Sequence, residues 1–493
     1  MRNLWFVSIC LFCFLPRLAL AVEPARLVEL EQRIEAVFAD REGDILDPAM
    51  DLVAVARTRS VLPDLPNLTV EDALVSLTDL RIVLAQLSLF VGGNNQLRIM
   101  RAQGQVVPKA LAVESGRITL SELQERARAL SADQPLLEGR AFALPVVIWP
   151  EAQLVLQPGD DLQLSREAGA FLINFGGFYA RSAQVRGVGD PNRQDAEFRP
   201  FVATAGAGYA LMAETRFQSL GFGKVAAYSG VSFLAGGVYP AQYATQLLFN
   251  QFSDVGELTL RRTQSTRVEG NVFRNSQALP LAIKGAVDAH IIGNVFLDSP
   301  SASTLRVSEG ARGTRLIRNV LLSGKGGGID LRGAGIGSVI ADNLVWSHKG
   351  VGISVDRSDC ARIAGNAVIR NGQKGIALTT SRAAEVSGNL LYRNGSAGIL
   401  VNHQPASTLT AIRGNVLARN RVGLFLASAA DLSLGGNDFS NQFPRLVGGD
   451  AQFESGKIFQ DLQGVEPVEM SFGGIAWPAL QALECPQLTV KEE

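Results

Sequence analysis

Short apolar segments, separated by glycine and asparagine, recur along the chain from about residue 144 onward. In one motif an apolar residue is followed two or three positions later by asparagine, and these asparagines lie 22 to 26 residues apart. They are Asn271, Asn294, Asn319, Asn343, Asn366, Asn389, Asn415 and Asn437. A second motif, Gly before an apolar-x-apolar triplet, keeps the same period at Gly328, Gly352, Gly375, Gly398 and Gly423.

This period predicts an all-β chain that forms a right-handed parallel β-helix, with three short strands in each coil of about 22–26 residues. Asparagine suits a tight bend because it tolerates left-handed dihedral angles and its side chain bonds backbone groups. We expect the eight asparagines to stack in one bend, about 4.8 Å apart. Leucine-rich repeats, hexapeptide helices and calcium-binding nonapeptide repeats have other signatures, which this sequence does not show.

The residues before the repeats predict a small, mainly helical region over 22–143. Apolar residues from Pro24 to Ala39 recur at spacings of three and four, which is typical of an amphipathic helix. Thr69 and Ser121 are candidate helix N-caps, and the apolar run Leu80 to Phe90 suits either a buried helix or a strand. We expect this region to pack against or cap the β-helix of 144–450, and residues 451–493 to form a C-terminal tail or cap.

The first 21 residues have the features of a secretory signal peptide. Arg2 precedes the apolar stretch Leu4 to Leu15, and Ala19-Leu20-Ala21 provides small residues for cleavage. Cleavage would leave two cysteines, Cys360 and Cys485, which are too few for a disulfide framework. We therefore expect Cys360 to be a packed coil residue without a bridge partner. The predicted location is the periplasm, with no membrane span after cleavage.

Composition excludes several classes of function. The chain is 47% hydrophobic and 19% charged, which excludes global disorder. Its 46 basic and 47 acidic residues create no strong field for nucleic acid. Three histidines and four cysteines disfavour a zinc enzyme, and we predict neither a metal site nor a cofactor. We expect His290, His348 and His403 to be surface or loop residues.

Alternation along the Gly-apolar-x-apolar strands places a set of charged side chains on one outer face of successive coils. The members of this charged line are Arg261, Lys284, Arg306, Asp330, Arg332 and Asp356. The four cations lie on four consecutive coils, and arginine can bind carboxylates through two hydrogen bonds. The pattern predicts a groove for an anionic polysaccharide such as polymannuronate. The alternative is a set of ordinary solvated side chains on an exposed sheet.

Several segments outside the repeats match a known family. They are residues 110–120, residues 164–172, Phe198-Arg-Pro-Phe-Val202, residues 215–222 and Ala227-Tyr228. The coils resemble carbohydrate-binding and sugar hydrolysis repeats. Together, these segments and the coils resemble the periplasmic mannuronan C5-epimerases of bacterial alginate biosynthesis. The resemblance implies conversion of mannuronate to guluronate within the polymer. It also implies partners in a periplasmic biosynthesis and export complex.

The chain departs from this family at the catalytic signature Asp-Pro-His-Asp. The aligned residues are Ala282, Ile283, Lys284 and Gly285, so Lys284 occupies the position of the family's histidine. An arginine that the family carries one coil later is replaced by Glu309. Lys284 is the candidate catalytic residue, although an ordinary lysine titrates near ~10.4 and would need a lowered pKa to act as a base.

Three functions remain open from the sequence, and all concern an alginate-like exopolysaccharide. The first is an epimerase with an altered site that uses Lys284 or an aspartate. The second is a catalytically inactive homologue that binds the polymer as a scaffold. The third is a polysaccharide lyase, but lyases on this fold commonly hold calcium between clustered carboxylates, and Asp330 with Asp356 is a small set for that ion.

Overall fold

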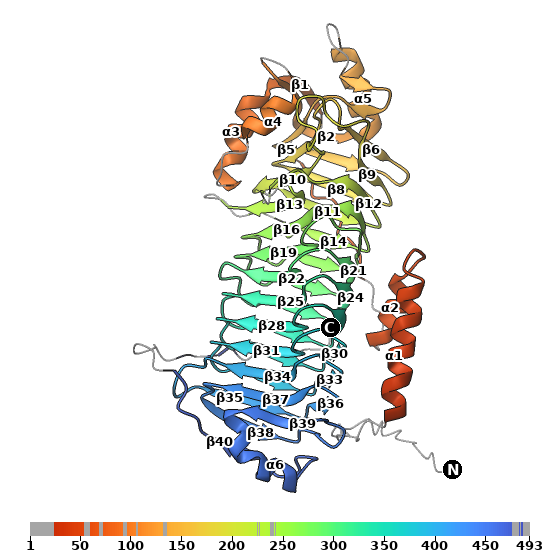
Figure 1. The fold of residues 1–493 in the computed structure, drawn as a ribbon. Helices are drawn as coiled ribbons and strands as arrows, with labels where there is room; N and C mark the ends of the chain where they lie inside the picture. The colour runs from red at the N-terminus through yellow and green to blue at the C-terminus, as the bar shows by residue number, and fades with distance from the viewer. Residues whose placement is uncertain are drawn as a thin grey trace, which may run out of the picture.

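The computed structural model describes residues 24–53, 60–68, 72–91, 96–104, 107–131, 136–223, 225, 227–236, 241, 243–475, 483 and 485–486. Its body is a right-handed parallel β-helix in which the coils stack along one axis (Figure 1). The fold class predicted from the sequence is confirmed. The proposed boundaries at residues 143 and 450 remain predictions, and the signal segment and Thr69 lie outside the described residues.

Each coil contributes a strand to each of three faces, and strands of one face pair in parallel with their counterparts above and below. Face 1 consists of β2 (Lys109–Thr119), β5 (Val146–Leu156), β7 (Leu172–Asn174), β10 (Val202–Gly206), β13 (Gly230–Ala235), β16 (Glu257–Arg261), β19 (Leu281–Lys284), β22 (Ser303–Ser308), β25 (Gly327–Arg332), β28 (Ile353–Asp356), β31 (Ile376–Thr379), β34 (Ala397–Asn402), β37 (Val422–Ala427) and β39 (Arg445–Gly449).

The other two faces follow the same order along the chain. Face 2 contains the second half of β5 and then β8 (Gly177–Arg181), β11 (Tyr209–Ala213), β14 (Gln246–Leu248), β17 (Arg267–Glu269), β20 (His290–Ile292), β23 (Arg315–Ile317), β26 (Val339–Ala341), β29 (Arg362–Ala364), β32 (Glu385–Ser387), β35 (Leu409–Arg413) and β38 (Asp431–Gly435). Face 3 contains β4 (Ala141–Phe142), β6 (Asp161–Ser165), β9 (Gln184–Val188), β12 (Arg216–Leu220), β15 (Gln251–Val255), β18 (Val272–Arg274), β21 (Val295–Ser299), β24 (Val320–Gly324), β27 (Leu344–His348), β30 (Ala367–Ile369), β33 (Leu390–Tyr392) and β36 (Val416–Ala418). A short strand, β3 (Leu137–Glu138), pairs antiparallel with β4.

The bend between faces 2 and 3 holds the predicted ladder of asparagines. In the central coils, the backbone N–H and the side-chain amide of each asparagine donate to Oδ1 of the next one; for Asn366 and Asn389 both distances are 2.9 Å. All eight predicted members take part, and Asn250 extends the ladder by one coil. The predicted stacking is confirmed. A second, shorter ladder of Asn371, Asn394, Asn420 and Gln442 lies in the bend between faces 3 and 1.

The interior is apolar, and like side chains stack on one another from coil to coil. Phe217, Phe252, Phe273 and Phe296 form one such stack, with ring centroids 4.6–4.9 Å apart. This separation equals the spacing of neighbouring strands, so each ring rests on its counterpart in the next coil. The repeated sequence pattern therefore fixes both the strand register and the packing of the core.

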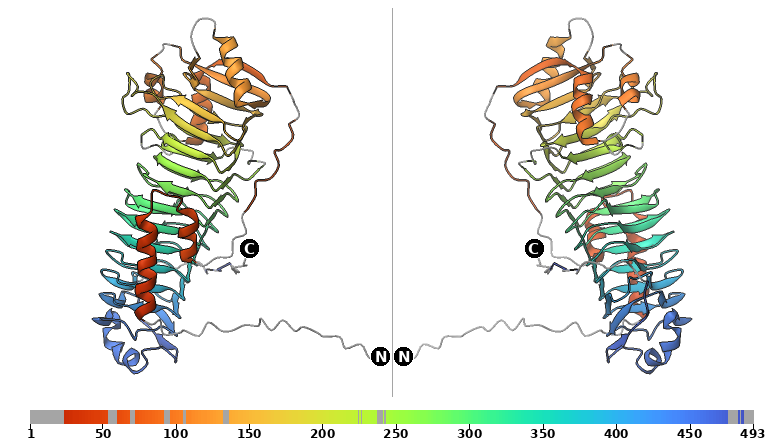
Figure 2. Two further views of the ribbon diagram at one scale, coloured as in Figure 1. Left: turned by 90° about the vertical axis from the view of Figure 1, so that its right-hand side faces the viewer. Right: turned by 90° about the vertical axis from the view of Figure 1, so that its left-hand side faces the viewer.

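The first helices lie lengthwise on the outside of face 3, as Figure 2 shows in its left panel. They are α1 (Pro24–Ala39), α2 (Leu46–Met50) and a 3-10 turn, η1 (Asp51–Val53). Leu27 and Ile34 of α1 are buried against apolar residues of the coils. The buried carboxylate of Glu31 forms ion pairs with Arg370 and Arg393. The predicted amphipathic helix is confirmed.

The upper end of the β-helix is closed by the remaining N-terminal elements. β1 (Leu74–Asp79) pairs antiparallel with β2, and α5 (Leu120–Leu130) packs against both strands. α5 begins two residues earlier than predicted, because Thr119 and not Ser121 is its N-cap, in a capping box with Glu122. The apolar run from Leu80 is a helix, α3 (Leu80–Val91), which is followed by α4 (Gln96–Ala102).

The lower end is closed by the C-terminal segment. After β39 come η2 (Asp450–Glu454), α6 (Ser455–Gln460) and β40 (Val468–Met470), which pairs antiparallel with β38. The chain then turns back toward the upper coils, and Ile475 exchanges backbone hydrogen bonds with Gln404 and Ala406.

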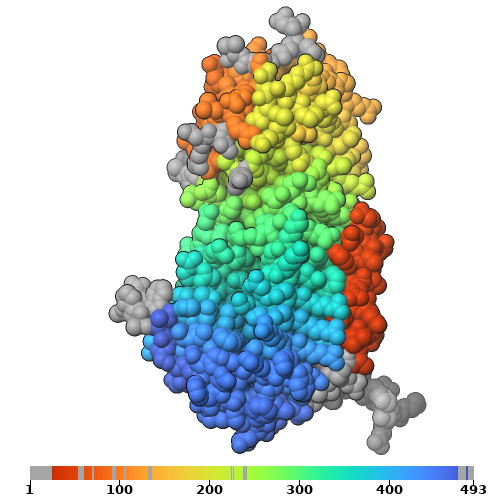
Figure 3. All heavy atoms as spheres, in the orientation of Figure 1, coloured from red at the N-terminus to blue at the C-terminus, as the bar shows by residue number. Residues whose placement is uncertain are grey.

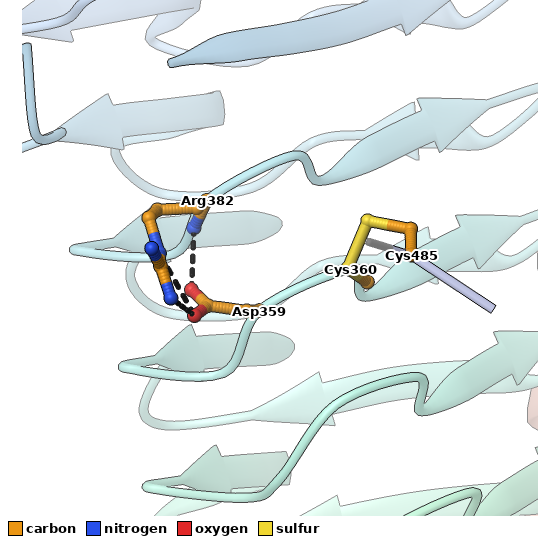
Figure 4. The surroundings of a disulfide bond; sticks show 4 residues. All are labelled: Asp359, Cys360, Arg382 and Cys485. Atoms are coloured by element: carbon orange, nitrogen blue, oxygen red, sulfur yellow. Dashed lines mark hydrogen bonds and ion pairs between the residues drawn. A yellow bond between two sulfur atoms is a disulfide. The ribbon is translucent and has the colours of Figure 1, made fainter. Parts of the chain in front are cut away.

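A disulfide joins this returning segment to the coils. Cys485 is bonded to Cys360, which is buried in the bend after β28 (Figure 4). The expectation of an unpaired Cys360 is therefore wrong. The two cysteines are 125 residues apart in sequence, and only the reversal of the chain after β40 brings their Cα atoms to 5.5 Å. Beside the bridge, Nε and Nη2 of Arg382 both donate to Oδ2 of Asp359.

His348 corrects a second expectation, because it is buried at the end of β27 and is not a surface or loop residue. Its Nε2 lies 3.0 Å from Oγ1 of Thr304, and its backbone N–H donates to Asn371, the first member of the shorter ladder. Burial lowers the pKa of His348 to about 4. His290 lies on face 2 in β20, and His403 is exposed in a bend, as expected for a surface residue.

The buried His348 predicts a pH dependence of stability. An unfolded histidine takes up a proton as the pH falls through ~6.5, whereas the folded protein resists protonation down to about pH 4. Between these values the unfolded state binds more protons than the folded state. The free energy of unfolding should therefore decrease as the pH is lowered from 6.5 to 4, by about 3 kcal/mol in all. Urea denaturation at pH 7, 5.5 and 4 measures this loss. His348→Gln should remove that part of the pH dependence, and an unchanged profile would contradict the assignment.

Candidate functional site

The register of face 1 places the charged line as the sequence predicts. Arg261, Lys284, Ser308, Arg332 and Asp356 are neighbours in one column on successive strands. A parallel column, two residues earlier in each strand, contains Thr259, Ala282, Arg306, Asp330 and Ser354. Both columns point outward because the residues between them fill the apolar core. The structure thus brings all six predicted site residues together on one surface.

Lys284 is held by a carboxylate that sequence reasoning missed. Its Nζ lies 3.2 Å from Oε1 of Glu257, at the start of β16, and the same oxygen accepts a hydrogen bond from Thr259. The Lys284 and Glu257 side chains are 22% and 13% exposed, so the pair is only partly screened by water. Glu257 alternates with Thr259 and Arg261 on the outer side of β16, so strand alternation could have placed it, but no repeat motif marks it.

Asp330 forms a second centre of ion pairs. Nε of Arg306 donates to Oδ2 of Asp330 at 3.0 Å, and Nη2 of Arg332 lies 3.6 Å from the same oxygen. Asp330 is 6% exposed, and its Oδ1 has no hydrogen-bond partner among the described residues. Such a buried acceptor gains free energy from any hydroxyl that reaches it. Asp356, one coil further, pairs with Arg357 at 3.1 Å.

Arg261 joins the charged line to the helix above it. Its Nη1 donates to the backbone oxygen of Val91, the last residue of α3, at 2.7 Å. Its Nε lies 3.9 Å from Glu309, whose carboxylate is half exposed. Each of the four cations in the charged line therefore has an acidic group within 4 Å. The surface is a network of ion pairs, in which Asp330 of the predicted line and the additional carboxylates of Glu257 and Glu309 pair with the cations.

This network has two chemical consequences. Arginine side chains that use one edge for an internal carboxylate keep further N–H groups for a ligand, and the carboxylates can accept hydrogen bonds from sugar hydroxyls.

Within the described part of the chain, no group of three or more His, Cys, Asp or Glu side chains is placed to hold a metal ion. In the same part, no helix is long and apolar enough to cross a membrane.

Sequence comparison relates the chain to enzymes of polysaccharide modification. It is 25% identical over 306 residues to the mannuronan C5-epimerase of Pseudomonas putida, covering 57% of each chain. It is 23% identical over 340 residues to that of Pseudomonas syringae pv. tomato, covering 63% of this chain and 62% of the relative. The chain is thus similar to mannuronan C5-epimerases. The predicted family is confirmed, although the chain spans less than two thirds of the length of these relatives.

Structural comparison agrees on the fold. The crystal structure titled periplasmic alginate epimerase AlgG superposes with a TM-score of 0.62 at 18% identity, covering 80% of this chain and 98% of that one. A family described as periplasmic copper-binding protein (NosD) matches residues 245–447, which are coils of the β-helix. Both descriptions name the periplasm, in agreement with the predicted location.

Proposed function

We propose that this protein binds a polyuronate along face 1 in the periplasm and takes part in the biosynthesis of an alginate-like exopolysaccharide. The observation that carries the proposal is the aligned charged line, since four cations repeat at the spacing of the coils on one outer surface. That spacing, about 4.8 Å, is close to the length of one sugar unit in an extended chain. Similarity to mannuronan C5-epimerases supports a uronate polymer as the ligand, and we propose export proteins of the periplasm as partners.

Binding would use the ion pairs in place of free cations. A uronate carboxylate can accept hydrogen bonds from the unused N–H groups of Arg306 and Arg332, while sugar hydroxyls donate to Asp330. Arg332 is the most accessible cation of the line, with 58% of its side chain exposed, and Arg306 is 29% exposed. Because each arginine is already oriented by a carboxylate, little side-chain entropy is lost when the polymer binds.

The geometry favours binding without turnover. Inversion at C5 needs a base on one side of the sugar ring and a proton donor on the other. Lys284 and Glu257 are joined by one ion pair on the same surface, so they can approach the ring from only one side. None of the three histidines lies on a face 1 strand. We therefore infer that the chain acts as a polymer-binding scaffold of the biosynthetic complex.

Epimerase activity is the second candidate, because Glu257 is a partly buried carboxylate that pairs with Lys284 from the coil before the one on which the resemblance places the catalytic signature. Glu257 would remove the C5 proton while Lys284 neutralises the uronate carboxylate, and water on the opposite side of the ring would return a proton to C5. Proton NMR of polymannuronate incubated with the protein in deuterated water separates the two functions. A scaffold binds without exchange at C5, whereas exchange that is lost in both Glu257→Gln and Lys284→Ala would establish the epimerase. The same spectra would show the unsaturated ends that a lyase makes.

Replacing the cations should weaken binding in a position-dependent way. Arg306→Ala and Arg332→Ala should each cost about 1.5–3 kcal/mol of binding free energy if the side chain contacts a carboxylate. Affinity should also fall as salt rises, because exposed charges are screened beyond ~8 Å at physiological ionic strength. Calorimetric titration with polymannuronate oligomers measures both effects.

Arg413→Ala is the matched control for these substitutions, because Arg413 is an exposed arginine on face 2. It should bind like the unaltered protein. If the variants of the charged line bind as well as this control, the proposed groove is wrong.

A further inference from the structure

The outer surface of face 1 is divided into a covered upper part and an open lower part. The outward column of the charged line continues upward through Leu234 and Ala205, and the parallel column through Ser232 and Ala203. These upper residues are buried. Most of them pack against apolar side chains of α3 and α4, in a cluster separate from the interior core. From β16 to β28 the outward residues, apart from Ala282, are polar or charged, and several are partly exposed.

The boundary between the two parts is closed. The ring of Phe90, near the end of α3, lies so close to β10 that a carbon atom added at Gly206 would meet it at 2.9 Å. One residue further, the backbone oxygen of Val91 is hydrogen-bonded to Arg261, the uppermost cation of the charged line. No layer remains between helix and sheet for a sugar ring. Figure 1 shows α3 and α4 beside the upper coils, and Figure 3 shows their orange surface merging with that of the coils.

We propose that the charged line binds an end of the polysaccharide chain, because α3 stops the chain at Arg261 and the polymer can leave only toward β28 and the coils below. This inference rests on the proposed function and adds a direction to it. An open strip of sheet would accept any internal stretch of a polymer. A strip that is blocked at one end accepts a terminal stretch, with the last sugar against the end of α3.

The dimensions of the open part limit how many sugars it holds. The charged line extends over five strands, from β16 to β28. Four intervals of about 4.8 Å give a length of about 19 Å, which corresponds to about four sugar units. Below it, the outward positions Ala377, Leu400 and Phe425 carry no charge. Affinity should therefore rise with oligomer length up to about four units and then level off.

The blocked end also has a chemical preference. The C-terminus of a helix carries partial negative charge, which favours hydrogen-bond donors and disfavours anions. Val91 is the last residue of α3 and already accepts a hydrogen bond from Arg261. The terminal sugar should therefore present hydroxyl groups to the helix, with its carboxylate turned toward Arg306 and Arg332.

The stoichiometry of binding tests this inference. Polymannuronate fractions of about 5, 10 and 30 units are titrated into the full-length mature protein, and the number of protein molecules bound per chain is measured by analytical ultracentrifugation. One protein per chain at every length is the expected result. A number that grows in proportion to chain length would overturn end recognition and leave the proposed function intact. If no fraction binds, both proposals are wrong.

A second measurement uses chemically blocked ends. Oligomers of about 10 units carry a bulky fluorophore on the reducing end, on the non-reducing end, or on both. Blocking the end that enters the groove should weaken binding at least about tenfold, which is 1.4 kcal/mol, and blocking the other end should have little effect. Binding that survives both labels would contradict the inference. The Arg413→Ala protein should reproduce the pattern, because that residue lies outside face 1.

Discussion

Asn366→Ala should destabilise the protein by about 3–5 kcal/mol, because one substitution leaves several buried backbone and amide groups without partners. The Asn366 amide donates to the backbone oxygens of Ile340 and Ala364 and to Oδ1 of Asn389. Its own Oδ1 accepts two hydrogen bonds from Asn343. Asn366 is 1% exposed, so water replaces these bonds poorly. Chemical denaturation measures the loss.

Asn402→Ala is the control for the ladder. Asn402 has the same side chain, but it points outward from β34 and is partly exposed. Among the described residues its side-chain amide hydrogen-bonds Thr379 and His403. Its loss should cost less than about 1 kcal/mol. Equal destabilisation by the two substitutions would show that the stacked bend is not what stabilises the coils.

Breaking the disulfide should be the second large effect. Chain-entropy arguments give about 3–5 kcal/mol for a bridge that closes a loop of this size, and Cys360 and Cys485 are 125 residues apart. Adding a reductant should lower the denaturation midpoint of the unaltered protein. The double variant Cys360→Ser, Cys485→Ser should have the lower midpoint already and should not respond to reductant.

Mass spectrometry gives an independent check of the bridge. Alkylation of the unfolded, non-reduced protein should label no thiol in the mature chain, and labelling after reduction should modify two. Two free thiols before reduction would contradict the disulfide. Limited proteolysis should cleave the segment after β40 more readily once the bridge is reduced, because the covalent link to the coils is then lost and non-covalent contacts such as the backbone hydrogen bonds of Ile475 remain.

The repeated part of the fold could be predicted from the sequence because its information is local. Each coil repeats the same apolar pattern and the same asparagine bend, so period and register can be read within about 25 residues. The placement of α1 could not be predicted in this way. Its amphipathic pattern shows that one side is buried, but nothing in residues 24–39 indicates that face 3 of coils far along the chain receives it.

The candidate site also contains some residues that could be predicted from the sequence and others that could not. The positions of Lys284 and Arg306 follow from strand alternation, and the structure confirms both columns. Their ion pairs and hydrogen bonds do not follow from it. Glu257 is 27 residues from Lys284 and is not marked by a repeat motif, and Val91 is 170 residues from Arg261 and lies outside the coils. The same reasoning applies to Cys485, since the reversal of the chain after β40 leaves no signal in the spacing of the cysteines.

The docking of α1 has a consequence for the order in which the molecule assembles. α1 is the first described element of the chain, yet its ion pairs with Arg370 and Arg393 span 335 to 362 residues. During synthesis and export the helix therefore emerges long before its binding surface exists. The coils can form one upon another as they appear, because each needs only its neighbour. α1 can bind face 3 only after the last third of the chain has been made. We therefore expect its docking to be a late and slow step of folding, which occurs when most coils of the β-helix have formed.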